Sequence, residues 1–170
     1  MLFRSRESDN TAAELILKEL GVAKRGEGST AAGTQAVIDA LAEAGLPTAG
    51  LRMGDGSGLE VTNQASCALL AAALRLPDGG GSPRLASSLA VAGRTGTLSL
   101  RLAGTPLEGK LRAKTGSLNG VSGLVGYVDG HRGLSFAFVA NGPLSDSAGR
   151  LLQDRLVALL AGYPGPQPRL

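Results

Sequence analysis

Residues 113–120 read AKTGSLNG and stand directly before two apolar, β-branched runs that a glycine-rich turn joins. The first run is 121–128, the turn is 129–133 and the second run is 134–140. Two such runs separated by about five residues predict an antiparallel hairpin. The stretch 110–118 alternates well enough to predict a third strand. This region therefore predicts the sheet of the protein.

Lys114, Thr115 and Gly116 lie on this third predicted strand. Lysine brings a cation, the threonine hydroxyl is both donor and acceptor, and glycine lets a ligand backbone lie close to the strand. An exposed lysine on an edge strand is also an ordinary protection against edge-to-edge aggregation. The tripeptide alone leaves a binding site and a structural role both open.

The composition bounds the class of protein. A length of 170 residues, with 43% hydrophobic and 18% charged residues, is typical of one folded domain. Only 3% of residues are aromatic, and the net charge of +3 is scattered, so a nucleic-acid surface is not expected. One cysteine and one histidine exclude an internal disulfide, thiolate zinc clusters and multi-histidine metal sites. The sequence shows no transmembrane run and no apolar signal-peptide centre near Met1, and it calls for no cofactor.

Capping signals and apolar periodicity predict helices before the strands. The first should run from about Thr11 to Leu20, with Thr11 and Glu14 as a capping box and Gly21 as its C-terminal stop. Further helices are expected at about 33–44, 63–75 and 84–89. A last helix, at about 148–160, should be capped by residues 145–147. Its expected apolar face consists of Leu151, Leu152, Leu156, Leu159 and Leu160.

The order of elements predicts the fold class. Helices come first, then strands, then one helix, which favours α+β with an antiparallel sheet of about three strands. We expect a helical part at about 8–90, a sheet part at about 97–160 and a flexible tail at 163–170. So small a sheet leaves an edge and an apolar face uncovered, which predicts weak stability or association through that face.

Residues 104–110 have the spacing of a Walker A loop, but Leu111 stands where a serine or threonine would hold magnesium. A proline lies inside the loop, and the next residues predict a strand instead of the helix whose N-terminus would bind phosphate. Nucleotide binding is therefore disfavoured.

Three further candidates fail on their patterns. Ser57 lies between glycines, but Asp55 replaces the first glycine of a nucleophile elbow. A triad of Ser57 with His131 and an aspartate is conceivable, yet His131 in the predicted hairpin turn is better explained as solvated. Cys67 lies in an apolar predicted helix and is expected to be a small core residue.

Several ordered segments carry a resemblance to a known family. They are 7–14 with Ser8-Asp9-Asn10, 55–59 (DGSGL), 88–93, 96–98, 113–118 (AKTGSL) and 121–127 (VSGLVGY). From about Phe3 to Leu160 the chain resembles the carboxy-terminal half of the serine-type D-alanyl-D-alanine carboxypeptidase/endopeptidases. These are the class C low-molecular-mass penicillin-binding proteins, of the penicillin-binding protein 4 type. The resemblance implies a β-lactamase/transpeptidase-like fold, of which residues 1–162 would be the carboxy-terminal half of the DD-peptidase domain.

The resemblance implies a serine acyl-transfer site. Ser8 would help move protons to and from the leaving group, and Asn10 would hold the amide of the substrate. Lys114 would supply the positive field for the substrate's terminal carboxylate. Implied ligands are peptidoglycan stem peptides and β-lactams, and the implied location is periplasmic or extracytoplasmic.

Three neighbours of Lys114 complete the implied substrate site, namely Thr115, Gly116 and Ser117. The hydroxyls of Thr115 and Ser117 would donate to the same carboxylate. The backbone N–H of Ser117 would be one arm of the oxyanion hole, and the nucleophile's own N–H would be the other.

The chain departs from the family because it contains no Ser-x-x-Lys nucleophile motif. Its four lysines, at 18, 24, 110 and 114, have leucine or glycine three residues before them. In the family, the nucleophile, the first strands and the signal peptide lie upstream of the Ser-x-Asn segment. We therefore expect this chain alone to be inactive. The alternative is a non-catalytic half-domain that binds a peptidoglycan peptide or a protein partner.

Overall fold

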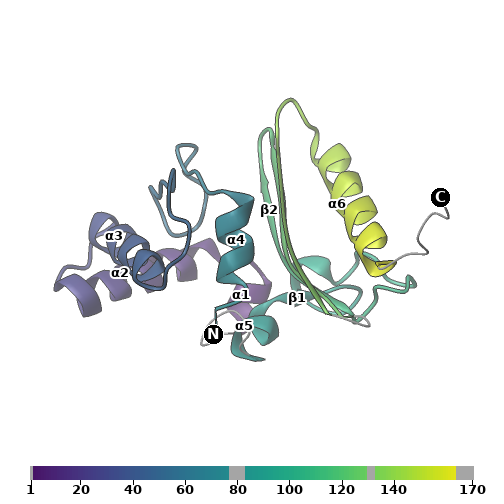
Figure 1. Ribbon diagram of the computed structural model, residues 1–170, viewed down its shortest axis with the longest axis horizontal. Helices are drawn as coiled ribbons and strands as arrows, with labels where there is room; N and C mark the ends of the chain where they lie inside the picture. The colour runs from purple at the N-terminus through teal and green to yellow at the C-terminus, as the bar shows by residue number, and fades with distance from the viewer. Residues whose placement is uncertain (1, 77–82, 130–132, 164–170) are drawn as a thin grey trace. The chain divides into compact units, whose positions relative to one another are not determined.

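The computed structural model describes residues 2–76, 83–129 and 133–163. The chain divides into two compact units, Met1–Ser88 and Leu89–Leu170, and each has its own internal contacts (Figure 1). Helices make up the first unit, and an antiparallel sheet with one long helix makes up the second. This is the α+β class that the sequence predicts.

Two helices form the main contact of the first unit, α2 (Asn10–Arg25) and α3 (Thr30–Glu43). The described part of this unit also contains three shorter helices, namely α1 (Leu2–Arg6), α4 (Cys67–Ala73) and α5 (Pro83–Ser88). Cys67 is exposed at the start of α4, so the expected core position of this residue is wrong. Among the helices of the described ranges, none has the length and apolar character needed to cross a bilayer.

The boundaries of α2 differ from the sequence prediction. Asp9 is the N-cap and accepts a hydrogen bond from the Ala12 N–H at 2.9 Å, and the helix ends at Gly26, whose φ is 72°. Gly21 is buried in the interior of α2, where an added Cβ would lie 2.9 Å from the Gly33 nitrogen of α3. The predicted stop at Gly21 is therefore wrong, because this glycine allows the two helices to approach each other.

The predicted capping box is also wrong. Instead of bonding the N-terminus of its own helix, the Glu14 carboxylate accepts hydrogen bonds from the backbone N–H groups of Gly56 and Ser57 at 3.0 and 2.8 Å. Ser57 donates its hydroxyl to Asp55 at 3.0 Å. The Asp-Gly-Ser-Gly-Leu turn is thus anchored to α2.

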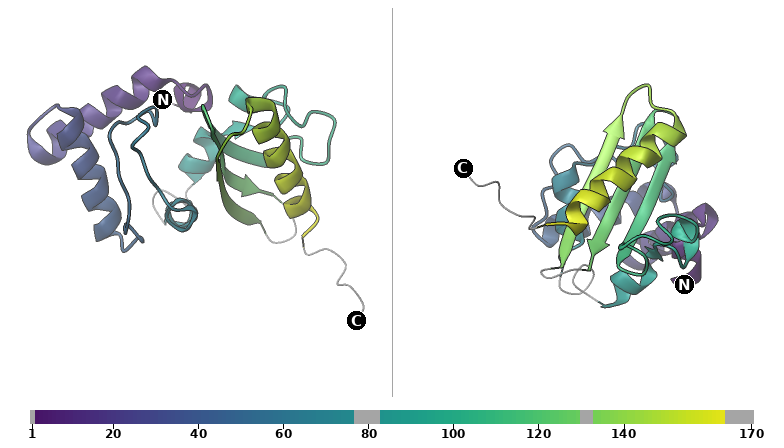
Figure 2. Two further views of the ribbon diagram at one scale, coloured as in Figure 1. Left: turned by 90° about the horizontal axis from the view of Figure 1, so that it is seen from above. Right: turned by 90° about the vertical axis from the view of Figure 1, so that its right-hand side faces the viewer.

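The second unit is built on a four-stranded antiparallel sheet in the order β1-β2-β3-β4. Its strands are β1 (Ala90–Val91), β2 (Leu111–Leu118), β3 (Val121–Val128) and β4 (Leu134–Asn141). The 3-10 turn η1 (Gly96–Leu98) lies between β1 and β2, and α6 (Asp146–Ala161) covers one face of the sheet (Figures 1 and 2). The three predicted strands are present, and the two-residue β1 is too short for a periodic pattern to reveal.

The face that α6 presents to the sheet matches the predicted leucine face only in part, since Leu156 and Leu160 pack against the core. Its buried residues are Gly149, Gln153 and Val157, whereas Leu151 and Leu159 are 52% and 76% exposed. A Cβ on Gly149 would lie 2.5 Å from the Ser122 hydroxyl, so glycine lets the helix lie close to β3. Gln153 donates to the same hydroxyl at 2.8 Å. A glycine and a polar side chain therefore orient the helix.

Two predicted features lie outside the described residues. His131 is one of residues 130–132, and all of the expected tail at 163–170 except its first residue lies at 164–170. Residues 104–110 lead into β2 and not into a helix, so no helix N-terminus follows them to bind a phosphate.

Candidate active site

The Lys114–Ser117 segment lies on β2 past the end of β1. On one side it pairs with β3, with Lys114 opposite Val125 and Ser117 opposite Ser122. On the other side, β1 pairs only with Ala113 and Arg112. Within the described part of the sheet, this half of β2 is therefore an edge.

The direction of the backbone groups at this edge follows from the ladder. The Leu111 carbonyl accepts a hydrogen bond from the Ala92 N–H at 3.0 Å, so it points to the β1 side. Successive residues of a strand point their backbone groups to alternate sides. Thr115 and Ser117 therefore point their N–H and C=O groups to the same edge, where an extended peptide could pair with them.

Lys114 is held close to this edge. Its ammonium group donates to the Thr115 carbonyl at 2.8 Å. Burial lowers the pKa of Lys114, because the charged form loses hydration. A partly desolvated cation interacts more strongly with a nearby anion than a fully hydrated one does.

A cavity of about 220 Å³ lies on the α6 side of β2. Its lining consists of Thr97, Arg101, Thr115, Gly116, Ser117, Ser122, Arg150 and Gln153. Thr115 donates its hydroxyl to the Thr97 hydroxyl at 2.9 Å. Two guanidinium groups and several hydroxyls are donors suited to a small anionic group such as a carboxylate.

A buried network fixes one of the two arginines. Arg101 donates to the Gln153 carbonyl oxygen at 2.9 Å and pairs with Asp154 at 2.5 Å. Gln153, which is 2% exposed, donates in turn to Ser122 at 2.8 Å and to the Gly123 carbonyl at 3.0 Å. Arg101 is thus part of the support beneath Ser117 and Ser122.

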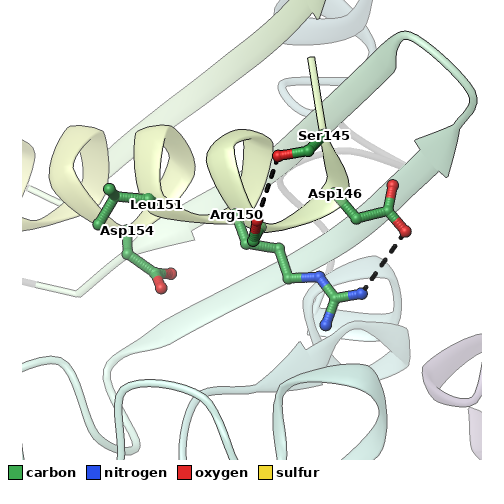
Figure 3. A pocket seen from close by; sticks show the side chains of 6 residues that line it. Ser145, Asp146, Arg150, Leu151 and Asp154 are labelled. Atoms are coloured by element: carbon green, nitrogen blue, oxygen red, sulfur yellow. Dashed lines mark hydrogen bonds and ion pairs between the residues drawn. The ribbon is translucent and has the colours of Figure 1, made fainter.

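The other arginine is held more loosely. Arg150 lies 3.9 Å from the Asp146 carboxylate, one helical turn away, and both side chains are more than 60% exposed (Figure 3). Asp146 also accepts a hydrogen bond from the Ser117 hydroxyl at 3.1 Å. Sequence reasoning missed Arg101, Asp146, Arg150 and Gln153, because no local pattern connects them with β2.

Ser8 and Asn10 belong to the first unit. Ser8 follows α1 with a φ of 58°, a left-handed conformation that costs a residue other than glycine about 1 kcal/mol. Asp9 caps α2, and Asn10 is the exposed first residue of that helix. Ser8 and Asn10 are thus neighbours at the start of α2, while Lys114, Thr115, Gly116 and Ser117 are neighbours on β2 of the second unit.

A metal site needs several ligand side chains that lie close together. Residues 2–76, 83–129 and 133–163 contain no group of three or more histidine, cysteine, aspartate or glutamate side chains that could hold an ion.

Comparison with known proteins decides the family. The sequence model of the D-Ala-D-Ala carboxypeptidase 3 (S13) family matches residues 4–163. The chain belongs to this family. Similar members include a D-alanyl-D-alanine carboxypeptidase from an Actinomadura species, at 41% identity over 94% of this chain and 31% of that protein. Carboxypeptidase DacB of Mycolicibacterium smegmatis is 37% identical over 91% of this chain and 35% of its own length.

Solved structures give the same result. Penicillin binding protein 4 (dacB) from Haemophilus influenzae matches 95% of this chain and 39% of its own, with a TM-score of 0.84 and 26% identity. A predatory endopeptidase from Bdellovibrio bacteriovorus, solved with an immunity protein, shares the fold, with a TM-score of 0.70 and 23% identity. The 170-residue chain spans about a third of the length of the curated relatives it matches.

Proposed function

We propose that this chain supplies the substrate-holding part of a serine-type D-Ala-D-Ala peptidase, acting on peptidoglycan stem peptides as a DD-carboxypeptidase or endopeptidase. The observation that carries this proposal is the open edge of β2. Thr115 and Ser117 line a cationic cavity there, next to Lys114 on the same strand, in a chain of the D-Ala-D-Ala carboxypeptidase 3 family. The activity would place the protein outside the cytoplasm, in contact with the cell wall.

The proposed binding mode uses the groups of β2 in order. The peptide extends along the edge and pairs with the backbone of Thr115 and Ser117. Its terminal carboxylate accepts hydrogen bonds from the hydroxyls of these residues, in the positive field of Lys114. The Ser117 N–H donates to the oxygen of the scissile carbonyl, and removal of such a donor typically costs about 10²–10³ in rate.

The chemical step needs a nucleophile that residues 1–170 do not contain as a Ser-x-x-Lys motif. A serine hydroxyl of that motif would give its proton to the motif's lysine and attack the carbonyl carbon, and the C–N bond would break with release of the amine on its C-terminal side, which is D-alanine for a carboxypeptidase. Ser8 would pass a proton to the leaving amine, and Asn10 would hold the neighbouring amide. Water would then hydrolyse the acyl-enzyme. The left-handed conformation of Ser8 supports a functional role, since glycine would be less strained there.

The second candidate function is non-catalytic binding. The lack of a Ser-x-x-Lys motif favours it, because a half-site could still hold a stem peptide or a protein partner without cleaving a bond.

Replacement of Lys114 tests the proposal. We expect a protein that joins this chain to the upstream region of its relatives to hydrolyse a D-Ala-D-Ala peptide. Lys114→Ala should lower kcat/KM about 10²-fold, because the carboxylate loses its cation. The matched control is Lys110→Ala, which removes an exposed lysine just before β2 and should change kcat/KM less than about twofold.

Equal effects of the two substitutions would contradict the role of Lys114. Binding of the peptide without hydrolysis, in the joined protein, would favour the non-catalytic function.

A further inference from the structure

Asp146 lies beside the cavity next to β2, in a second hollow on α6 that also shares Arg150, and both of its carboxylate oxygens are in use there. Its Oδ1 atom accepts the hydrogen bond from the Ser117 hydroxyl at 3.1 Å, and its Oδ2 atom lies 3.9 Å from the Arg150 guanidinium (Figure 3). A hydroxyl and a guanidinium are the donors that a ligand carboxylate would seek here. Asp146 therefore holds the place of a carboxylate ligand.

We propose that Asp146 determines specificity by competing with a ligand carboxylate for Ser117 and Arg150, so that it disfavours peptides with a free C-terminus relative to neutral ones. This inference rests on the proposed function, in which the peptide carboxylate reaches Ser117. It adds Asp146 and Arg150 to the groups that recognise the substrate.

The contacts around Asp146 allow it to be displaced. Asp146 and Arg150 are 64% and 62% exposed, and exposed pairs of this kind are weak. Asp146 is not the cap of α6, because Ser145 accepts the capping hydrogen bond from the Ala148 N–H at 3.2 Å. Movement of the Asp146 side chain therefore leaves the start of the helix intact.

Of the two arginines, Arg150 is the one that can move to bind a ligand. Arg101 is 17% exposed and bound to Asp154 and Gln153, so it stays in place beneath the strand. Arg150 lines the same cavity from the surface of α6 and is paired across 3.9 Å. A ligand carboxylate would thus replace Asp146 as the ion-pair partner of Arg150.

Two peptides and three variants test this inference. The probes are N-acetyl-D-alanyl-D-alanine and its C-terminal amide, titrated into the 170-residue chain while the backbone NMR signals of Gly116 and Ser117 are followed. Asp146→Asn should tighten the carboxylate peptide about two- to fivefold and leave the amide nearly unchanged, because only the carboxylate competes. Arg150→Gln should weaken the carboxylate peptide by a similar factor.

The charge-matched control is Asp129→Asn, which removes one exposed carboxylate just beyond the other end of β3. It should not change the ratio of the two affinities by more than about 1.5-fold, since screening weakens distant charges. Dispersed NMR spectra show that each variant is folded.

The outcomes separate the two proposals. If both peptides shift the signals of Gly116 and Ser117, but Asp146→Asn leaves their affinity ratio unchanged, competition by Asp146 is wrong and the proposed function stands. If neither peptide shifts these signals in any variant, the peptide site on β2 is wrong, and the role of Asp146 fails with it.

Discussion

Asp55 closes the loop between α3 and α4 through several hydrogen bonds. Its carboxylate accepts from the backbone N–H groups of Gly58, Leu59 and Glu60 at 2.8–2.9 Å and from the Asn63 amide at 2.7 Å. Burial alone would raise the pKa of Asp55, but these hydrogen bonds outweigh it and lower the pKa below its ordinary value of 3.8. The ionised carboxylate therefore stabilises the folded loop.

Asp55→Asn should lower the free energy of unfolding by roughly 1–2 kcal/mol at pH 7. This value is at the low end of the range for hydrogen bonds to charged groups, because Asp55 is partly exposed. A folded-state pKa below the unfolded one gives stability that is fully present above the unfolded pKa. That stability is lost as the pH falls through the folded value, so the difference between the two proteins should shrink below about pH 4. Urea unfolding of both proteins at pH 7 and pH 3 measures this difference in the free energy of unfolding.

Glu43→Gln, at the exposed end of α3, is the control and should change stability by less than about 0.5 kcal/mol. A difference for Asp55→Asn that stays constant from pH 7 to pH 3 would show that ionisation of Asp55 does not stabilise the loop.

At the scale of elements, α2 and α3 depend on glycine where they touch. A Cβ on Gly33 would lie 2.3 Å from the Leu17 carbonyl oxygen, and a Cβ on Gly21 would lie 2.6 Å from the Glu27 carbonyl oxygen. Backbone atoms cannot move aside as the end of a side chain can. The close packing of the two helices therefore excludes any larger residue at these positions.

Gly33→Ala should destabilise the protein by about 1–3 kcal/mol, although alanine favours a helix by about 1 kcal/mol over glycine. The steric cost of separating α2 and α3 exceeds the gain in helix propensity. Thermal unfolding followed by circular dichroism measures the effect. Gly162→Ala serves as the control, because its nearest neighbour would lie at an ordinary 3.6 Å, and it should be neutral or slightly stabilising. A stabilised Gly33→Ala would disprove the close contact.

Local signals predicted the strands well and the helix faces poorly. The alternation in β3 appears directly in its burial, with Ser122, Leu124, Gly126 and Val128 buried and the residues between them half-buried. Of the predicted leucine face of α6, only Leu156 and Leu160 pack against the core, since Gly149 and Gln153 decide which side meets β3. Apolar periodicity cannot detect a face that is chosen by close approach and by a buried hydrogen bond.

At the scale of the whole molecule, the missing Ser-x-x-Lys motif gives a direct test. The 170-residue chain should gain no mass after incubation with benzylpenicillin, because no serine in it has the activating lysine. The form that carries the upstream region should gain the mass of one penicillin. Intact-mass spectrometry measures both, and the mass of the protein from its source cells shows whether it exceeds 17.1 kDa.

Heat-denatured samples of each form are the control for non-specific acylation. A penicillin adduct on a serine of the native 170-residue chain would contradict the proposal that the nucleophile lies outside it.

The sequence by itself determined the fold class, the hairpin and the segments that reveal the family. These features depend on neighbours along the chain, through the pleat of a strand, the preference of caps and the order of motifs. It also singled out Lys114, Thr115, Gly116 and Ser117, because all four lie in one continuous motif.

Only the tertiary structure decided what surrounds this motif. The edge past β1, the support of Ser122 by Gln153, and the contact of Asp146 with Ser117 join residues about twenty to thirty positions apart. Such contacts depend on how the sheet and α6 pack, and packing depends on close approach and buried hydrogen bonds that no local pattern records.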